Sequence, residues 1–252
     1  MGKRFEDKVA IVTGGTGAGI GHAVARAFAR EGAKVTICGR NTDRLARASE
    51  DIKSTGAEVL SIRCDVSKVD QVQAMVKQTL EEWGKVDILV NNAFAVIYRD
   101  LVDLTDKQWD LMINVNLNGS FYCSRAVLPG MIARKYGRII NLSSEVVTRP
   151  SPQQCGYISA KAGIIGLTRG LATEVGKYGI TVNCVCPGII WNDDIAKMPY
   201  PEGTWEKARE DIPLGRFGTP DEAAALVLFL ASDDASYLSG DTITVGGGLG
   251  SI

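Results

Sequence analysis

Tyr157 and Lys161 stand four residues apart, a spacing that places their side chains on the same face of a helix. Ser144 lies thirteen residues before Tyr157, just past an apolar run that ends at Leu142. A phenol can donate or accept a proton, a serine hydroxyl can hold a carbonyl oxygen, and an ammonium group beside a phenol favours its ionised form. Each feature alone is common. Together, the three side chains indicate proton transfer to or from an oxygen atom.

A glycine-rich run between residues 13 and 21 is the second chemical feature. Five of the eight positions from Gly14 to Gly21 are glycine, and the run separates an apolar stretch from an amphipathic one. Glycine lets backbone N–H groups approach a phosphate, and the following helix N-terminus carries partial positive charge. A flexible loop is the simpler interpretation, but a place between the first strand and the first helix favours a dinucleotide site. We expect phosphate contacts from Gly14, Gly15, Thr16, Gly19, Ile20 and Gly21.

The end of the second apolar run bears on which dinucleotide would bind. Dinucleotide-binding folds usually place an acidic side chain there for the adenosine ribose, whereas this chain has Arg40 followed by Asn41. A guanidinium group can pair with a 2′-phosphate, so Arg40 favours NADP (NADPH), with NAD possible. The alternative is that Arg40 only caps the start of an exposed helix.

The elements that position these residues follow from the hydrophobic pattern. Short, continuously apolar runs alternate with amphipathic stretches, which is typical of parallel strands buried on both faces and linked by helices. The predicted fold is α/β: a Rossmann-type, doubly wound, seven-stranded parallel sheet with helices on both faces, formed by residues 1–252 as one dinucleotide-binding and catalytic domain. The expected strands are 8–13, 33–38, 58–63, 86–91, 137–142, 180–186 and 241–245. The expected helices are 20–31, 42–54, 68–83, 106–135, 157–178 and 220–231.

Residues 189–218 interrupt this alternation. The segment contains tryptophans and prolines, shows no strand pattern and directly follows an expected strand. A long irregular insertion in a compact domain is usually a lid or binding loop, and ligands of open parallel sheets bind beyond the carboxyl ends of the strands. We therefore expect this segment to cover the substrate.

These features together resemble the short-chain dehydrogenase/reductase family over nearly the whole chain. The shared motifs are the glycine turn, Cys64-Asp65-Val66, Asn91-Asn92-Ala93, Asn114-Val115-Asn116-Leu117-Asn118-Gly119, Ser144, the Tyr157 and Lys161 pair, and Pro187-Gly188. The resemblance implies an NAD(P)-dependent oxidoreductase that interconverts a ketone and a secondary alcohol. It implies that Tyr157 donates or accepts the proton, Ser144 holds the carbonyl, Lys161 binds the nicotinamide ribose and Asn116 orders a water in the proton relay.

The resemblance also implies further cofactor contacts. They come from Asp65, Val66, Asn92, Ala93, Tyr157, Lys161, Pro187, Gly188, Ile190 and Asn192. The chain departs from the family pattern in an enlarged glycine turn, in Phe94 where a glycine is usual, and in Asn192 where a threonine is usual. The run Val245–Gly248 also lacks the usual aspartate. None of these departures removes a catalytic group.

The expected substrate pocket is mainly apolar. Its residues are Phe94, Glu145, Val146, Val147, Gln154, Cys155, Ile190, Trp191 and the stretch from Met198 to Trp205. This lining favours an NADPH-preferring carbonyl reductase with an apolar or aromatic substrate. The main alternative is a 3-oxoacyl-thioester reductase, which would favour basic residues at the pocket mouth, with Arg99, Arg134 and Arg149 as scattered candidates. A catalytically silent dinucleotide-binding regulator is the alternative of another class, disfavoured by the complete set Asn116, Ser144, Tyr157 and Lys161.

Composition narrows the expected partners. The net charge of −1, with no block of basic residues, argues against nucleic acid and anionic membrane surfaces. A charged start and the lack of a long apolar run predict a cytoplasmic protein, in which the six cysteines stay free. One histidine and a single close cysteine pair make a poor metal site, so no metal is expected. The helix expected at 157–178 is apolar nearly all round, which indicates a subunit contact. The family resemblance suggests a homotetramer.

Overall fold

The computed structural model describes residues 3–192, 195, 197 and 203–249 of the chain. Seven parallel strands form one sheet in the order β3-β2-β1-β4-β5-β6-β7. The strands are β1 (Val9–Thr13), β2 (Lys34–Gly39), β3 (Val59–Arg63), β4 (Ile88–Asn91), β5 (Gly137–Leu142), β6 (Ile180–Pro187) and β7 (Thr242–Val245). The predicted Rossmann-type sheet is therefore confirmed, because the chain runs outward from β1 to one edge and then from β4 to the other.

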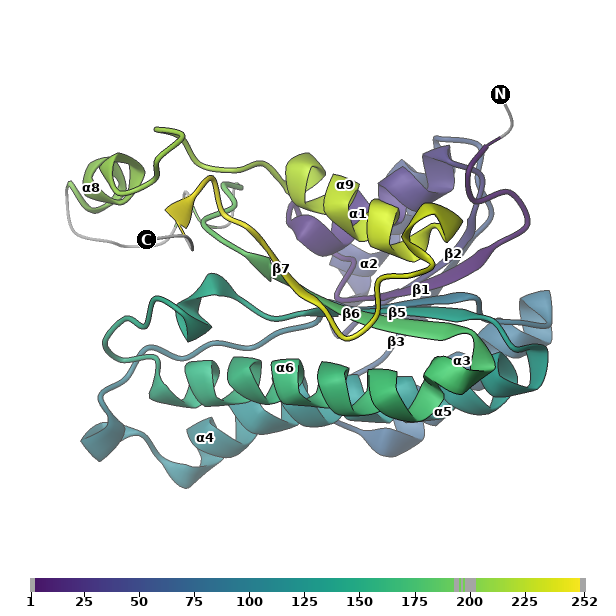
Figure 1. Ribbon diagram of the computed structural model, residues 1–252, viewed down its shortest axis with the longest axis horizontal. Coiled ribbons are helices and arrows are strands. Elements are labelled where there is room, and N and C mark those ends of the chain that lie inside the picture. Colours follow the sequence, from purple (N-terminus) through teal and green to yellow (C-terminus); the bar gives the residue numbers. More distant parts are fainter. Residues whose placement is uncertain (1–2, 193–194, 196, 198–202, 250–252) are drawn as a thin grey trace.

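Helices cover both faces of the sheet (Figure 1). One layer holds α1 (Ile20–Arg30), α2 (Thr42–Lys53) and α9 (Pro220–Ala231), and the other holds α3 (Val69–Trp83), α4 (Asp106–Met112), α5 (Gly119–Arg134) and α6 (Cys155–Val175). The short helix α8 (Thr204–Glu210) lies beyond the edge of the sheet where β6 ends. None of the helices in the described part of the chain is both long and apolar enough to cross a bilayer.

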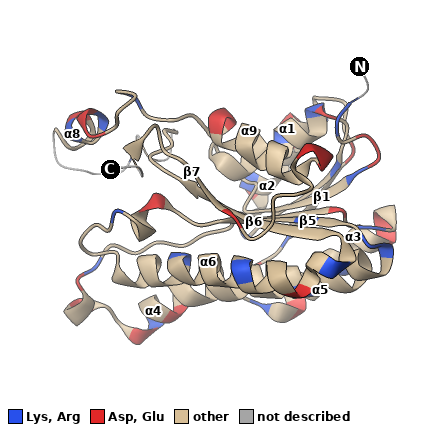
Figure 2. Ribbon diagram, viewed as in Figure 1, with Lys and Arg blue, Asp and Glu red and all other residues tan. Residues whose placement is uncertain are grey.

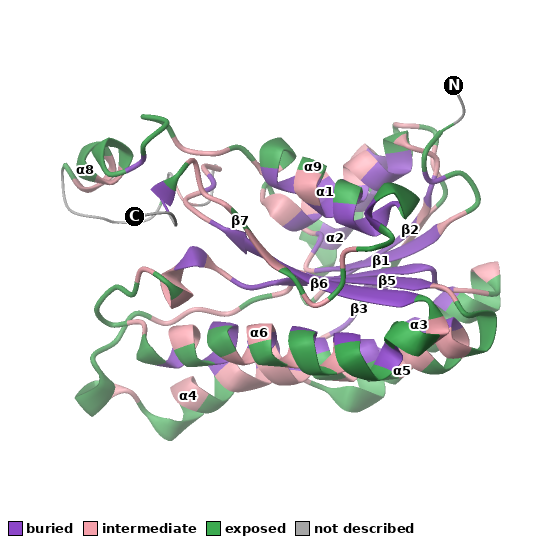
Figure 3. Cartoon of the chain, in the orientation of Figure 1, coloured by how far each residue is buried: buried purple, intermediate pink, exposed green. Residues whose placement is uncertain are grey.

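The sheet separates two apolar cores. Every residue of β1, β5 and β6 is buried (Figure 3), as expected for parallel strands that pack against helices on both faces. On the α1 side, Phe28 packs edge-on against Phe5 with ring centroids 4.9 Å apart. On the α5 side, Met75 and Met131 are fully buried. The carboxyl ends of the strands are thus held on a rigid frame.

Two expectations about secondary structure need correction. The helix expected at 106–135 is divided into α4 and α5 by the π-helical segment η2 (Ile113–Asn118). Sequence periodicity does not distinguish i→i+5 from i→i+4 hydrogen bonds, and π segments are frequent at functional sites. The segment 189–218 is not wholly irregular, because it contains α8. Its residues 193–194, 196 and 198–202 lie outside the described part of the chain.

A buried chain of polar side chains connects β4, β5 and α6. Asn91 Nδ2 donates to Asn141 Oδ1 at 2.8 Å, and Asn141 Nδ2 donates to Thr168 Oγ1 at 2.9 Å. Thr168 Oγ1 in turn donates to the Ile164 carbonyl in its own helix at 2.8 Å. Because buried polar groups need partners, this chain fixes α6 relative to the two strands at its back.

The substitution Thr168→Val is expected to lower the free energy of unfolding by about 1–3 kcal/mol, because it leaves the buried Asn141 amide without its acceptor. Thr173→Val on the same helix is the matched control. The Thr173 hydroxyl also donates to the carbonyl four residues earlier, at 3.0 Å, but it is exposed. The control should change stability by no more than about 0.5 kcal/mol. Urea unfolding measures both, and equal losses would contradict a special role for the buried network.

Candidate active site

The candidate site lies at the carboxyl edge of the sheet, where four strand ends meet. The glycine turn follows β1, Asn91 ends β4, Ser143 and Ser144 follow β5, and Pro187 ends β6. The Ser143 N–H donates to the Val185 carbonyl at 2.8 Å, which continues the pairing of β5 and β6 up to the site. In open parallel sheets, ligands bind at this edge.

Ser144, Tyr157 and Lys161 lie together at this edge. Tyr157 and Lys161 are in the first two turns of α6, and the Lys161 Nζ lies 5.6 Å from the centroid of the Tyr157 ring. The Ser144 side chain is close enough to Tyr157 to form a hydrogen bond that lowers the pKa of the phenol. Ser144 also begins the short helix η3 (Glu145–Val147) by accepting the Val146 N–H at 3.4 Å. The structure thus brings together the three side chains whose spacing suggested proton transfer.

The protonation of Tyr157 differs from the expectation that Lys161 would acidify it. Burial raises the pKa of Tyr157 to about 12, and the hydrogen bond with Ser144 opposes this only in part. The Lys161 ammonium group is turned toward β5, where Nζ donates to the Leu142 carbonyl at 2.7 Å. Because low dielectric penalises a buried phenolate, the phenol of this protein is a protonated acid at neutral pH.

Lys161 has surroundings that the sequence analysis missed. Its side chain is 2% exposed, and this burial lowers the pKa of the ammonium group to about 8. The thiols of Cys184 and Cys186 on β6 act in the opposite direction and favour the charged lysine. The Cys-x-Cys spacing was visible in the sequence, but only the pairing of β6 with β5 places both thiols near Lys161. Five of the six free cysteines are buried, and Cys155 is exposed.

Asn116 lies in the π-helical segment η2 and is fully buried. Its Nδ2 donates to the carbonyl groups of Ala95 at 2.7 Å and Met112 at 2.8 Å. Its Oδ1 has no hydrogen-bond partner among the described residues. These contacts fasten the loop after β4 to η2, and the unpaired amide oxygen can accept a hydrogen bond from a bound molecule or water.

The glycine turn is fastened to the end of β4 by Thr13 and Asn92. The Thr13 hydroxyl accepts the backbone N–H groups of Asn92 and Ala93, at 3.0 and 3.1 Å, while Asn92 Nδ2 donates to the Thr13 carbonyl at 2.9 Å. Gly14 has φ +69°, and a Cβ there would lie 2.8 Å from the Ala93 Cα. Gly14 therefore needs to be glycine both for its backbone conformation and for this close approach. The sequence analysis did not single out Thr13.

The other residues expected at the cofactor surround the same turn. A Cβ on Gly19 would have Asn192 Nδ2 as its nearest neighbour, at 3.9 Å, so the turn faces the start of the segment 189–218 across open space. The Asn192 Oδ1 accepts the Ile195 N–H at 3.1 Å. Gly15 packs against Ile37, and a Cβ on Gly39 would lie 2.7 Å from the Thr16 side chain.

The residues that follow β2 and β3 lie at the same carboxyl edge of the sheet as the glycine turn. Arg40 is exposed, and the cap of α2 is the Asn41 side chain, which accepts the Arg44 N–H. The interpretation of Arg40 as a helix cap is therefore wrong. Asp65 Oδ1 accepts the N–H and hydroxyl of Ser67 within its own turn. Val66 is buried against Gly119.

Of the residues expected at the substrate, Cys155 is exposed and so is Phe94. The Phe94 side chain is 59% exposed, beside the end of β4, whereas Glu145 is buried and Val147 and Gln154 are partly buried. The Oε1 atom of Gln154 is buried without a hydrogen-bond partner in the described part of the chain. These side chains line the loop from Ser144 to α6, next to Tyr157.

Trp191 belongs to an aromatic cluster that holds the described ends of the segment 189–218 together. Its ring stacks on Phe217 with centroids 5.0 Å apart and meets Trp205 of α8 edge-on at 5.1 Å. The Trp191 ring, which we predicted to contact substrate, therefore already packs against two aromatic neighbours. The expected contacts at Met198 to Pro201 lie outside the described residues.

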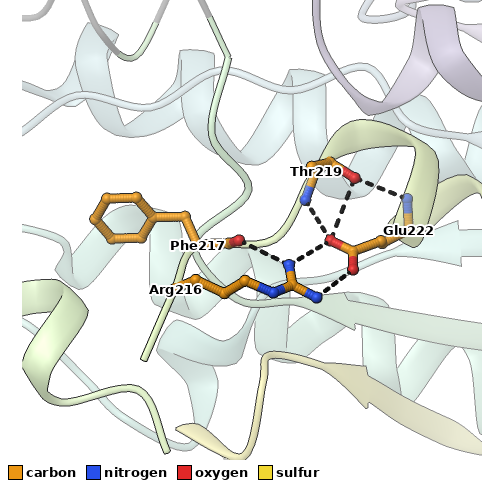
Figure 4. A network of polar contacts seen from close by, with 4 residues as sticks. All are labelled: Arg216, Phe217, Thr219 and Glu222. Atoms are coloured by element: carbon orange, nitrogen blue, oxygen red, sulfur yellow. Dashed lines mark hydrogen bonds and ion pairs between the residues drawn. The ribbon is translucent and has the colours of Figure 1, made fainter. Parts of the chain in front are cut away.

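An ion pair fixes the C-terminal end of the segment 189–218 to α9 (Figure 4). Arg216 binds Glu222 through two hydrogen bonds of 2.9 and 2.6 Å, and also donates to the Phe217 carbonyl at 3.1 Å. Glu222 completes a capping box with Thr219 at the start of α9. The Arg216 guanidinium holds the pKa of Glu222 down, at about 2. Phe217, and with it Trp191, is therefore anchored to a helix of the main layer.

The three arginines considered for a basic pocket mouth do not gather at one place. Arg134 ends α5 and binds the Val86 carbonyl and Asp87, just before β4 and thus at the opposite edge of the sheet. Arg99 is exposed, and its backbone N–H donates to the Gln153 carbonyl at 2.9 Å. Figure 2 shows Lys and Arg positions interspersed with Asp and Glu positions along the ribbon.

Comparisons with known proteins agree with this geometry. A family model described as "Enoyl-(Acyl carrier protein) reductase" matches residues 15–250. The chain is 41% identical to "3-oxoacyl-[acyl-carrier-protein] reductase FabG" of Chlamydia muridarum, covering 99% of this chain and 100% of that protein. It is 39% identical to "(2S)-[(R)-hydroxy(phenyl)methyl]succinyl-CoA dehydrogenase subunit BbsD" of Thauera aromatica, covering 97% of each. The crystal structure of levodione reductase superimposes with a TM-score of 0.92 at 35% identity, covering 98% of this chain and 99% of that one.

A nucleotide-binding parallel sheet with a Ser, Tyr and Lys constellation at its carboxyl edge is the architecture of one class of oxidoreductases. The chain belongs to the short-chain dehydrogenase/reductase family.

Proposed function

We propose that this protein is an NADPH-dependent reductase that converts a ketone into a secondary alcohol. The observation that carries the proposal is the meeting of Ser144, Tyr157 and Lys161 beside the glycine turn, with the phenol protonated at neutral pH. A protonated phenol is the acid that carbonyl reduction needs. The reverse reaction requires a base in the same place, which the burial of Tyr157 disfavours.

Each residue of the proposed site has a separate role in the reduction. When bound, the cofactor supplies a hydride to the carbonyl carbon. As negative charge grows on the carbonyl oxygen, the hydroxyl groups of Ser144 and Tyr157 donate to it, and the Tyr157 proton passes to the oxygen to complete the alcohol. Lys161, whose ammonium group donates to the Leu142 carbonyl, would bind the nicotinamide ribose, as the family resemblance implies, and a proton from solvent restores the phenol. The unpaired Oδ1 of Asn116 supports a role in that return path.

The residues present fit a dinucleotide. The open backbone of the turn at Gly19, next to a helix N-terminus, suits a pyrophosphate. A groove of about 580 Å³ runs from the turn residues 16–19 between α1 and α2, and Arg44 and Arg47 of α2 line it. Together with the exposed Arg40, these arginines support a preference for the 2′-phosphate of NADP over NAD.

The substrate that we favour is a 3-oxoacyl thioester, which replaces the apolar ketone as the leading candidate. Relatives named for reduction of such a thioester match the chain along its whole length at about 40% identity. A simple apolar or aromatic ketone remains the second candidate, because Phe94 is an exposed apolar side chain beside the end of β4 and Val147 is a partly exposed one just after Ser144. Assays with both classes of ketone and with NADPH and NADH distinguish them through the absorbance of the reduced cofactor.

Tyr157→Phe is expected to lower kcat at least about 100-fold, because it removes the acid and leaves the ring in place. NADPH binding, measured by fluorescence titration, should stay unchanged. Tyr178→Phe, at the far end of α6, is the matched control and should keep full activity. Turnover of Tyr157→Phe within about tenfold of the unmodified enzyme would contradict the assignment. NADPH binding by the unmodified protein without reduction of any ketone would point to a silent regulator.

Arg40→Asp is expected to shift the kcat/KM preference from NADPH toward NADH by at least about tenfold, because it replaces a charged partner of the 2′-phosphate with a repelling group. The control is Arg30→Asp at the end of α1, an exposed arginine at the opposite edge of the sheet. Steady-state kinetics with both nucleotides measure the preference. An unchanged preference in Arg40→Asp would assign 2′-phosphate binding elsewhere.

We also propose a homotetramer, with α6 in a subunit interface. The outward face of α6 exposes Ala162, Gly166 and Gly170, and nothing lies within 4 Å of a Cβ built on either glycine. Small residues at this spacing let another helix approach closely. Light scattering coupled to size exclusion should give about four times the chain mass, and Gly166→Arg should reduce it. A monomer at micromolar concentration would contradict the proposal.

A further inference from the structure

Glu145, the residue after Ser144, places a carboxyl group next to the site, and one of its two oxygens lacks a hydrogen-bond partner among the described residues. The residue is 8% exposed, and its Oε2 has no hydrogen-bond partner among the described residues. Buried polar groups in proteins are nearly always paired, and leaving one unpaired costs free energy. An apolar side chain of similar size would avoid this cost. The position of Glu145 is therefore better explained by a bound molecule than by folding.

Two glycines make the space for this carboxyl group. A Cβ on Gly188, just past β6, would lie 2.7 Å from Glu145 Oε2, and one on Gly246, just past β7, would lie 3.1 Å from it. The carboxyl group thus rests against two bare Cα atoms between Ser144 and the Pro187–Gly188 turn. Neither neighbour has a side chain that could pair with it.

The surrounding charges decide which form of the carboxyl group is present. Burial raises the pKa of Glu145 to about 7, and the guanidinium of Arg149 opposes this. Arg149 is shared with Asp211, 3.9 Å away beyond α8, and with the Leu249 carbonyl at 3.5 Å. The other titratable groups near the site are Cys155, Tyr157 and Lys161 of α6 and the thiols of Cys184 and Cys186 on β6, of which Cys186 has its pKa lowered to about 7 by its hydrogen bond with Cys184. Below neutral pH the Glu145 side chain is therefore largely a carboxylic acid, which donates a hydrogen bond, and above neutral pH it is largely a carboxylate, which only accepts.

We propose that the protonated Glu145 donates a hydrogen bond to a second carbonyl oxygen of the substrate and so selects 1,3-dicarbonyl compounds over simple ketones. Because Glu145 directly follows Ser144, an oxygen bound to it can lie close to the carbonyl oxygen that Ser144 holds. A 3-oxoacyl thioester has its second carbonyl two carbons from the reacting one. The inference rests on the proposed function and names the feature of the substrate that the enzyme recognises.

The test compares two isomeric substrates, the N-acetylcysteamine thioesters of 3-oxohexanoic and 5-oxohexanoic acid. The selectivity is the ratio of their kcat/KM values with NADPH. For the unmodified enzyme, this ratio should fall about tenfold between pH 6 and pH 8, because a group with a pKa of about 7 loses about nine tenths of its protonated form over that interval. Enolisation of the 3-oxo thioester affects every variant equally.

Two variants distinguish the effect of the Glu145 hydrogen bond on the selectivity from the effect of Glu145 ionisation. Glu145→Gln keeps a donor of the same shape, so its selectivity should match that of the unmodified enzyme at pH 6 within about threefold and should lack the fall that is specific to Glu145. Glu145→Leu should lower the selectivity at pH 6 by about 10- to 100-fold. Glu174→Gln, on the exposed face of α6, is the matched control and should behave as the unmodified enzyme.

The outcomes are distinguishable. Unchanged selectivity in Glu145→Leu, or the full pH dependence persisting in Glu145→Gln, would overturn the inference while leaving the reductase function intact. Weaker NADPH binding in both variants with unchanged selectivity would also overturn it and assign Glu145 to the cofactor site. If neither thioester is reduced by the unmodified enzyme, the proposed function itself fails.

Discussion

A reciprocal pair of hydrogen bonds ties the helix that carries Tyr157 to the strand that leads to Ser144. The Lys161 ammonium group, buried beneath the site, donates to the Leu142 carbonyl at 2.7 Å, and the Ser143 hydroxyl returns a hydrogen bond to the Lys161 carbonyl at 2.8 Å. A buried ammonium group with too few partners is costly, so α6 can take only the position that keeps this contact. The relative placement of phenol and hydroxyl depends on it.

Burial sets the chemical state of the groups around that contact. It raises the pKa of Tyr157 to about 12 and of Glu145 to about 7, and lowers that of Lys161 to about 8, each in the direction of the uncharged form. Tyr157 and, below neutral pH, Glu145 are therefore neutral donors where a substrate oxygen would lie. Such donors stabilise developing negative charge without prior reorganisation, which is why a dry pocket suits carbonyl reduction.

The segment 189–218, which we predict to cover the substrate, is built differently from the proposed catalytic edge. Its C-terminal end is fixed by the Arg216–Glu222 pair and by the stack of Trp191 on Phe217, so two described parts of the segment are fastened to α9. The residues proposed as catalytic, by contrast, follow the buried strand β5, lie on α6 or lie in η2. The proposed catalytic residues are therefore held by the core, whereas the segment 189–218 is held by contacts at the periphery.

Hydrophobic pattern and motif spacing by themselves determined the seven strands, the parallel sheet, the glycine turn and the helix face shared by Tyr157 and Lys161. These features depend on local periodicity and on short spacings, which one chain segment contains in full. Tertiary structure alone decided that η2 interrupts the helix expected at 106–135, that burial keeps Tyr157 protonated, and that Arg134 lies at the opposite edge from the pocket. It also decided that Thr13 fastens the glycine turn and that Glu145 Oε2 lacks a hydrogen-bond partner among the described residues. Burial and pairing arise between segments distant in sequence, and a pKa depends on which of them exclude water.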